Sequence, residues 1–244
     1  MSLTAKLMLS PLLVAQALLT RRRMPRLPEA RGERAGVIGA GGRLRLLVVG
    51  DSSAAGVGVV SQREALALQL AQRVARDRPA RVEWRLLARS GLTTQQTLDM
   101  LQEQGAGHAD LAVVVTGVND VVDQIPSHRA VAARASLANW LRNGAGVQHV
   151  VFAPLPPIHH FPGLPQPLRW MAGADARRHN QALRRWVATR DDVSCVDMEM
   201  PLNRGVMASD GFHPGARVYR YCAASIAEHI VAGVWSRLSL EPQA

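Results

Sequence analysis

The residue types of a serine-based acyl-transfer site occur in this 244-residue chain, at Ser52, Asp210 and His213. A serine hydroxyl is a weak nucleophile at neutral pH, so it needs an imidazole to accept its proton. The imidazole in turn needs a carboxylate, which fixes its tautomer and stabilises its charged form. Because Asp210 and His213 are three residues apart, one turn of chain can supply both. We therefore expect Ser52, Asp210 and His213 to form a catalytic triad.

An acyl-transfer site also needs hydrogen-bond donors for the negative oxygen of its tetrahedral intermediate. The backbone N–H groups of Ser52 and Gly91 and the side-chain amide of Asn119 are the candidates. Each of these residues alone has a structural interpretation, because serine and asparagine cap helices and glycine adopts a positive φ in turns. Their occurrence together with an Asp-x-x-His pair favours an oxyanion hole.

Three polar neighbours accompany these candidates. We expect Asp120 to tie down the loop that presents Asn119, and Asp51 to bond to nearby backbone. Ser53 is a second hydroxyl beside Ser52, so any test of the nucleophile has to control for it.

The hydrophobic pattern indicates the elements that position these residues. From Arg43 onward, short β-branched apolar runs alternate with longer segments of helical periodicity, which is typical of a parallel sheet covered by helices on both faces. We expect strands near residues 44–50, 82–88, 111–116, 149–153 and 193–197. We expect helices near residues 62–77, 94–104, 127–143, 174–190 and 215–238. Ligands of such sheets bind outside the carboxyl ends of the strands, and the polar candidates come after those ends.

Four segments, in order along the chain, resemble the sequence blocks of the SGNH hydrolases, also called GDSL hydrolases. They are "VVGDSS", "ARSGLTT", "VVVTGVND" and "SDGFHPG". The resemblance implies an α/β fold, a three-layer α/β/α sandwich with a five-stranded parallel sheet of flavodoxin-like order. Ser52 is then the nucleophile and first oxyanion donor, with Gly91 and Asn119 as further donors. By the same resemblance His213 is the base, and Asp210 orients it.

Two positions bear on how far this resemblance extends. Ser53 stands where leucine gives the GDSL family its name, which leaves the nucleophile unchanged. Ala54 occupies the final glycine position of the G-x-S-x-G elbow, which argues against an α/β-hydrolase fold.

The expected activity is the serine-dependent hydrolysis of a carboxylic ester or thioester through an acyl-enzyme, with a small or lipid-derived acyl group and no cofactor. Acyl transfer to an alcohol or sugar uses the same residues and is an alternative. A non-catalytic binding protein of the same fold is a second alternative, and metal-dependent phosphoester hydrolysis is disfavoured because no ligand set of suitable spacing is present.

A proline-rich stretch, residues 154–173, is expected to be a long loop beside the site. Trp170, His159 and His160 are its candidate substrate contacts. We do not expect the two histidines to bind a metal, because neighbouring residues rarely ligate one ion and no acidic or cysteine ligand is near.

Residues 1–42 are expected to be an apolar and basic extension with a linker, and residues 43–240 the hydrolase domain. The apolar run at residues 7–19 is too short to span a bilayer. It is compatible with a signal peptide ending at residue 17, with an interfacial helix, or with a helix packed on the domain. We favour association of residues 7–26 with a membrane surface, because an apolar segment is combined with a basic cluster.

The glycine-rich "GVIGAGG" lies in the expected linker, residues 24–42, and is not interpreted as a dinucleotide loop because no strand is expected before it. The whole extension favours a bacterial-type cytoplasmic or membrane-associated protein, with export as the alternative.

The formal net charge of +10 is concentrated at the start of the chain. Residues 1–45 hold nine basic and two acidic residues, a net charge of +7, which leaves +3 for the rest. With 4% aromatic residues and no zinc-finger spacing, we expect no nucleic-acid partner.

Cys195 and Cys222 lack the spacing of a disulfide framework and are expected to be buried thiols, with a bridge left open. No feature indicates the oligomeric state.

Overall fold

The computed structural model describes residues 3–200 and 202–240 and has an α/β fold built around strand β2 (Gly42–Gly50). Successive side chains of a strand point to opposite faces. Leu44, Leu46 and Val48 pack into one hydrophobic core, while Leu47 and Val49 pack into a second. Because both faces of β2 are covered from Leu46 to Val49, this part of the strand is a continuous apolar run, as the fold class requires.

Five strands are parallel, in the order β3-β2-β4-β5-β6. Besides β2 they are β3 (Ala80–Ala88), β4 (Leu111–Val115), β5 (His149–Phe152) and β6 (Val193–Cys195). This confirms the five predicted strands and their flavodoxin-like order.

A sixth strand, β1 (Ala35–Ile38), pairs antiparallel with β3 at the edge of the sheet. The expectation that residues 24–42 form only a linker is therefore wrong for this stretch. Its four residues are too few and too exposed to give a strand signal. Gly39 and Gly41, at φ values of +80° and +118°, let the chain pass the start of β3, where a Cβ atom on Gly39 would lie 2.4 Å from the carbonyl oxygen of Ala80. The glycines thus serve a close backbone approach.

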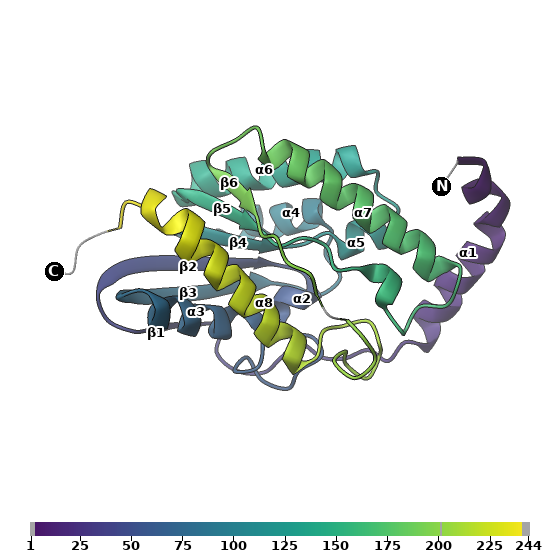
Figure 1. Ribbon diagram of the computed structural model, residues 1–244, viewed down its shortest axis with the longest axis horizontal. Helices are drawn as coiled ribbons and strands as arrows, with labels where there is room; N and C mark the ends of the chain where they lie inside the picture. Colours follow the sequence, from purple (N-terminus) through teal and green to yellow (C-terminus); the bar gives the residue numbers. More distant parts are fainter. Residues whose placement is uncertain (1–2, 201, 241–244) are drawn as a thin grey trace.

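Helices cover both faces of the sheet (Figure 1). One face carries α3 (Leu66–Asp77) and α8 (Ala216–His229). The other carries α4 (Thr94–Gln104), α6 (Ser127–Ala145) and α7 (Leu168–Val187). Shorter helical segments are α2 (Ser52–Ala55), α5 (Val118–Val122), η1 (Ile158–His160), η2 (Ile230–Val234) and η3 (Trp235–Arg237).

Helix α7 begins earlier than the pattern predicts, so the expected loop 154–173 ends at Pro167. Proline is compatible with the first turn of a helix, which has no intrahelical partner for its N–H groups. The prolines of this stretch predict a loop, but the last of them, Pro167, directly precedes the first residue of α7. Trp170 therefore lies on α7 and not in a loop.

The N-terminal helix α1 (Leu3–Arg23) lies at one end of the molecule beside α7 (Figure 1). Gln16 holds it there, because its Nε2 donates to the carbonyl oxygen of Gln166 at 2.7 Å and its Oε1 accepts from the N–H of Leu168 at 3.2 Å. Within the described residues, no helix has both the length and the apolar character needed to cross a membrane.

Candidate active site

Ser52 begins α2 directly after the end of the central strand. Asp51 precedes it as the N-cap, and the N–H of Asp51 donates to the carbonyl oxygen of Val115 at 3.1 Å. A Cβ atom at Gly50 would lie 2.1 Å from that same oxygen, so only glycine allows β2 and β4 to approach so closely. The sharp turn from strand to helix brings Ser52 to the carboxyl edge of the sheet, where it is half-buried.

The structure brings Ser52, His213 and Asp210 into one hydrogen-bonded chain. Oγ of Ser52 lies 3.1 Å from Nε2 of His213, and Nδ1 of His213 lies 2.5 Å from Oδ2 of Asp210. With the carboxylate at Nδ1, that nitrogen carries the proton and Nε2 is free to accept from the serine. The geometry is therefore that of a serine activated by an oriented imidazole.

The turn that carries His213 also fixes Asp210. Oδ1 of Asp210 accepts the backbone N–H groups of Phe212 and His213, both at 2.9 Å. Burial raises the pKa of the Asp210 carboxyl, but its hydrogen bonds from the side chain and backbone of His213 and the backbone of Phe212 outweigh this effect and leave the pKa below its usual value. Asp210 is thus a stable anion facing the imidazole.

Gly91 and Asn119 belong to the loops on either side of Ser52. Gly50 is in register with Ala88 of β3 and with Val115 of β4, so the loops after these strands emerge beside the turn that holds Ser52. Gly91 is exposed and has a φ of +83°, as expected for a turn glycine. Asn119 is half-buried on α5 and donates one Nδ2 hydrogen to the carbonyl oxygen of Leu92 at 2.9 Å, which leaves its second Nδ2 hydrogen for another acceptor.

The two expected structural carboxylates behave as predicted. Asp120 accepts hydrogen bonds from the N–H and hydroxyl of Thr94, and thereby ties the loop of Asn119 to the start of α4. Asp51 accepts the N–H of Ser53 at 2.9 Å. Burial raises the pKa of Asp51 to about 7, against the lowering effects of that hydrogen bond and of the nearby His213.

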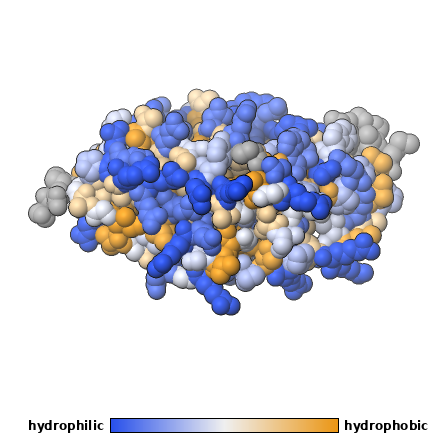
Figure 2. Space-filling view, turned by 60° about the horizontal axis from the view of Figure 1, so that its bottom comes forward, coloured by the Kyte–Doolittle hydropathy of each residue, from blue (hydrophilic) through white to orange (hydrophobic). Residues whose placement is uncertain are grey.

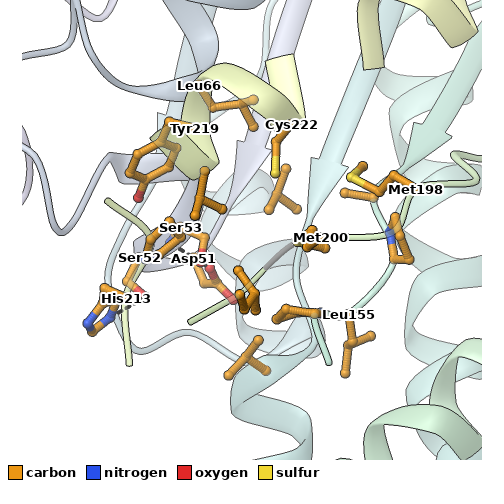
Figure 3. A pocket seen from close by; sticks show the side chains of 18 of the residues that line it. Asp51, Ser52, Ser53, Leu66, Leu155, Met198, Met200, His213, Tyr219 and Cys222 are labelled. Carbon is orange, nitrogen blue, oxygen red and sulfur yellow. Dashed lines mark hydrogen bonds between the residues drawn. The ribbon is translucent and has the colours of Figure 1, made fainter. Parts of the chain in front are cut away.

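An apolar cavity of about 70 Å³ opens beside Ser52 and His213 (Figure 3). Ser52 and His213 lie on one side of it, and Met198 and Met200 on the other. Most of the remaining lining is apolar and comes from α8 and from the segments after β4, β5 and β6, and it includes Val118, Leu155, Phe161, Leu202, Met207, Phe212, Cys222 and Ile226. Sequence reasoning missed the methionines because their spacing in an irregular segment resembles no motif.

The three expected substrate contacts, Trp170, His159 and His160, are not among the residues that line this cavity. His159 and His160 form the short helix η1, and their rings contact each other edge to face. Trp170 is 46% exposed on α7. Phe161, directly after the two histidines, lines the cavity instead.

A second serine–histidine cluster lies at the other end of the molecule. Oγ of Ser194 is 2.8 Å from Nε2 of His229 and 2.9 Å from Nε2 of His149. His229 ends α8, while His213 precedes its start, so about 20 Å of helix separates the two sites. Among the described residues no carboxylate hydrogen-bonds to either imidazole of this cluster, unlike His213. The sequence gives no sign of it, because its members come from three distant elements.

The side chains that could hold a metal are dispersed. Across residues 3–200 and 202–240, no group of three or more His, Cys, Asp or Glu residues has a metal-binding arrangement. Cys195 and Cys222 are both free and half-buried. Burial raises their thiol pKa values to about 11 and 12, respectively.

Comparisons with known proteins point to one family. The sequence model of the GDSL-like Lipase/Acylhydrolase family matches residues 48–221. No curated protein matches significantly. The lipase Lip_vut3 from a goat rumen metagenome superposes with a TM-score of 0.63 at 19% identity, over 75% of this chain and 95% of its own. The lipase/acylhydrolase from Enterococcus faecalis gives a TM-score of 0.55 at 20% identity, over 82% of this chain and 99% of its own.

A third solved structure is a mutant of Axe2, an acetyl-xylooligosaccharide esterase from Geobacillus stearothermophilus, with a TM-score of 0.58 at 18% identity over 81% of this chain and 97% of its own. At these identities the structures establish the fold, while the family match covers most of the chain. The chain therefore belongs to the GDSL-like lipase/acylhydrolase family and is a carboxylic ester hydrolase of the esterase and lipase type, with the SGNH hydrolase fold.

Proposed function

We propose that Ser52 is the nucleophile of this esterase, that His213 is its general base and acid, and that Asp210 orients His213. The observation that carries the proposal is the continuous chain from Asp210 through His213 to Ser52, at the mouth of an apolar cavity. Ser194 has two histidine partners, but no carboxylate among the described residues hydrogen-bonds to either imidazole, so Ser52 is the better candidate.

The first half-reaction acylates Ser52. Its Oγ attacks the carbonyl carbon while Nε2 of His213 takes the hydroxyl proton, and the π electrons move onto the carbonyl oxygen. The N–H groups of Ser52 and Gly91 and the second Nδ2 hydrogen of Asn119 are the proposed donors to that oxyanion. When the oxyanion collapses, the bond to the leaving oxygen or sulfur breaks and His213 returns the proton to the leaving group.

The second half-reaction releases the acid. Water replaces the alcohol, gives a proton to Nε2 of His213 and attacks the acyl carbon, and the tetrahedral species expels Ser52 with its proton restored. Asp210 stays anionic throughout, because its pKa is held below its usual value. Each cycle consumes one ester and one water.

The proposed substrate is an ester or thioester with a small or lipid-derived acyl group. The cavity offers almost only apolar side chains to that group, and removal of apolar surface from water favours its binding. Three methionines among the lining residues allow the shape to adapt to different chains, because methionine is unbranched and flexible.

The proposed further partner is an anionic membrane surface, contacted by residues 7–26. Four apolar side chains of α1 face solvent, Leu12, Val14, Leu18 and Leu19, each at least 47% exposed. Arg21, Arg22 and Arg23 come next and are exposed, and residues 1–28 contain no acidic residue. At the end of the molecule that carries α1, apolar and strongly hydrophilic residues adjoin (Figure 2). Burial of an apolar helix side together with attraction of arginines to lipid phosphates is a two-signal mode of membrane attachment.

The nucleophile is tested with a fluorophosphonate probe and a short-chain aryl ester. We expect the probe to label Ser52, and Ser52→Ala to lose both labelling and release of free acid. Ser53→Ala and Ser194→Ala are the controls and should keep both. Full hydrolysis by Ser52→Ala, or labelling that disappears in Ser194→Ala, would contradict the assignment.

A further inference from the structure

Arg134 is a buried cation beneath the loop that carries Asn119. It lies in the middle of α6, and its side chain is only 1% exposed. Its Nη2 donates to the carbonyl oxygen of Thr116 at 3.3 Å and lies 3.6 Å from Oδ2 of Asp120. Thr116 and Asp120 bracket Asn119, so one guanidinium contacts this loop on both sides of the proposed oxyanion donor.

Gly117 leaves room for that guanidinium. A Cβ atom at Gly117 would lie 2.0 Å from Nη2 of Arg134, and the backbone there has a φ of +121°, which favours glycine. The planar group therefore packs directly against the turn before Asn119.

The same cluster joins the two loops that carry the proposed donors. Asp120 accepts hydrogen bonds at 2.8 and 2.6 Å from the N–H and hydroxyl of Thr94, and Asn119 donates to the carbonyl oxygen of Leu92. Leu92 and Thr94 lie within three residues of Gly91. Asp120 and Asn119 thus link the two loops directly, while the guanidinium of Arg134 contacts only the loop of Asn119.

Stability alone does not account for a cation at this position. Burial lowers the pKa of Arg134, with Asp120 acting in the opposite direction. Nη1 is buried without a hydrogen bond to any described residue. Because a buried ion pair recovers little of its desolvation cost, an apolar side chain of similar volume is often at least as stable. What the guanidinium adds is directional contact with Thr116 and Asp120.

We infer that Arg134 is a positioning residue of the oxyanion hole, which holds residues 116–120 so that the second Nδ2 hydrogen of Asn119 faces the substrate carbonyl oxygen. The inference rests on the proposed function, because an oxyanion forms only if Ser52 attacks a carbonyl. Arg134 acts through Asn119, so it affects the chemical step and the stability of tetrahedral adducts more than the binding of the acyl group.

The test compares Arg134→Met with Arg142→Met, a matched control on the same helix whose arginine pairs with Asp192. On a short-chain aryl ester, Arg134→Met is expected to lower kcat by about 10- to 100-fold, somewhat less than the loss of a complete oxyanion donor, and to leave KM within about threefold. Arg142→Met should change neither constant by more than about twofold. Arg134→Lys should restore part of kcat.

Two further measurements separate positioning from a general structural role. An alkyl boronic acid binds a reactive serine as a tetrahedral adduct, so its affinity should fall in Arg134→Met along with kcat, while the affinity for the free carboxylic acid should not. The kcat of the double variant Arg134→Met/Asn119→Ala should lie within about twofold of the kcat of Asn119→Ala alone. The reason is that both changes remove the same donor. If Arg134→Met does not fold, the same measurements are made on the double variant Arg134→Met/Asp120→Asn. This variant removes both charges of the Arg134–Asp120 pair.

Equal losses of boronic acid and carboxylic acid affinity, or losses in kcat that multiply in the double variant, would overturn the inference. A wild-type enzyme whose Ser52 is not labelled by the fluorophosphonate would overturn the proposed function instead. The two failures are therefore distinguishable.

Discussion

Two buried carboxylates close to His213 differ in charge because they differ in hydrogen bonding. Oxygens of Asp210 accept the imidazole Nδ1–H and two backbone N–H groups, which lower its pKa despite burial. Asp51 accepts a single N–H, from Ser53, and burial raises its pKa to about 7. One residue is therefore an anion at neutral pH, while the other is close to half protonated.

Asp51→Asn tests this difference through the pH dependence of stability. A carboxyl whose pKa is about 7 when folded and 3.8 when unfolded binds protons better in the folded protein, so its contribution to stability is full below pH 3.8 and is lost as the pH rises to 7. The free energy of unfolding of Asp51→Asn relative to wild type should therefore increase by about 4 kcal/mol between pH 4 and pH 8.

Urea denaturation at several pH values measures this change, and Asp99→Asn, at an exposed site on α4, is the control. A difference between Asp51→Asn and wild type that stays constant with pH would show that folding does not raise the pKa of Asp51.

At the scale of elements, the site is assembled from segments at the carboxyl ends of successive parallel strands. The segment after β2 carries Ser52, the segments after β3 and β4 carry Gly91 and Asn119, and the segment after β6 leads to Asp210 and His213. The same segment after β6 supplies Met198, Met200 and Met207 to the cavity, and α8 contributes further apolar residues. With the segments after β4 and β5, these two elements form most of the lining, so we expect acyl specificity to depend on them.

Cys222, on α8, lines the cavity and gives a test of acyl-chain specificity. Cys222→Leu should reduce kcat/KM for longer acyl chains by about tenfold or more relative to acetyl esters, because each blocked methylene contact is worth about 1 kcal/mol. Cys222→Ala enlarges the same site and should shift the preference toward longer chains. Hydrolysis rates for esters of graded length measure both effects. Parallel changes at all lengths in the two variants would show that the acyl group binds elsewhere.

At the scale of the whole molecule, charge and exposed apolar surface are concentrated at the end formed by α1. Residues 1–28 carry a net charge of +5 of the total of +10, and four large exposed apolar side chains lie on α1. Gln16 turns toward α7 and bonds to its first turn, whereas leucines of the same helix face solvent. A helix that packs its polar residue inward and exposes its apolar side is suited to an external apolar phase.

Cosedimentation of the full chain with vesicles tests membrane attachment. We expect binding to phosphatidylglycerol vesicles, weak binding to phosphatidylcholine vesicles, and weakening by salt. Replacing Arg21, Arg22 and Arg23 with Gln should reduce the partition coefficient by about 100-fold, since each arginine near an anionic surface contributes about 1 kcal/mol. The charge-matched control replaces Arg63, Arg76 and Arg81 with Gln. Equal reduction by both sets, or no binding to anionic vesicles, would contradict the proposed partner.

Much of this organisation could be predicted from the residues. The apolar runs located five parallel strands, most directly β4, which is buried on both faces and has no polar position. The prediction failed for two segments that lack such an apolar run. Strand β1 is a short exposed edge, and the start of α7 is hidden among prolines that also suit a loop. Arg134 gave no signal, because an arginine in a helix is ordinarily exposed and its burial depends on the loop above it.

The order of residues was enough to predict the fold class and the residue types of an acyl-transfer site, because strand periodicity and side-chain chemistry are local properties. Which residues meet became clear only in three dimensions. The folded chain joins Ser52 to His213 across 161 residues, pairs Ser194 with His229 at the far end of the molecule, and leaves Trp170 and the two adjacent histidines outside the cavity. The physical reason is that contact between distant segments depends on strand register and helix packing, which involve the whole chain at once.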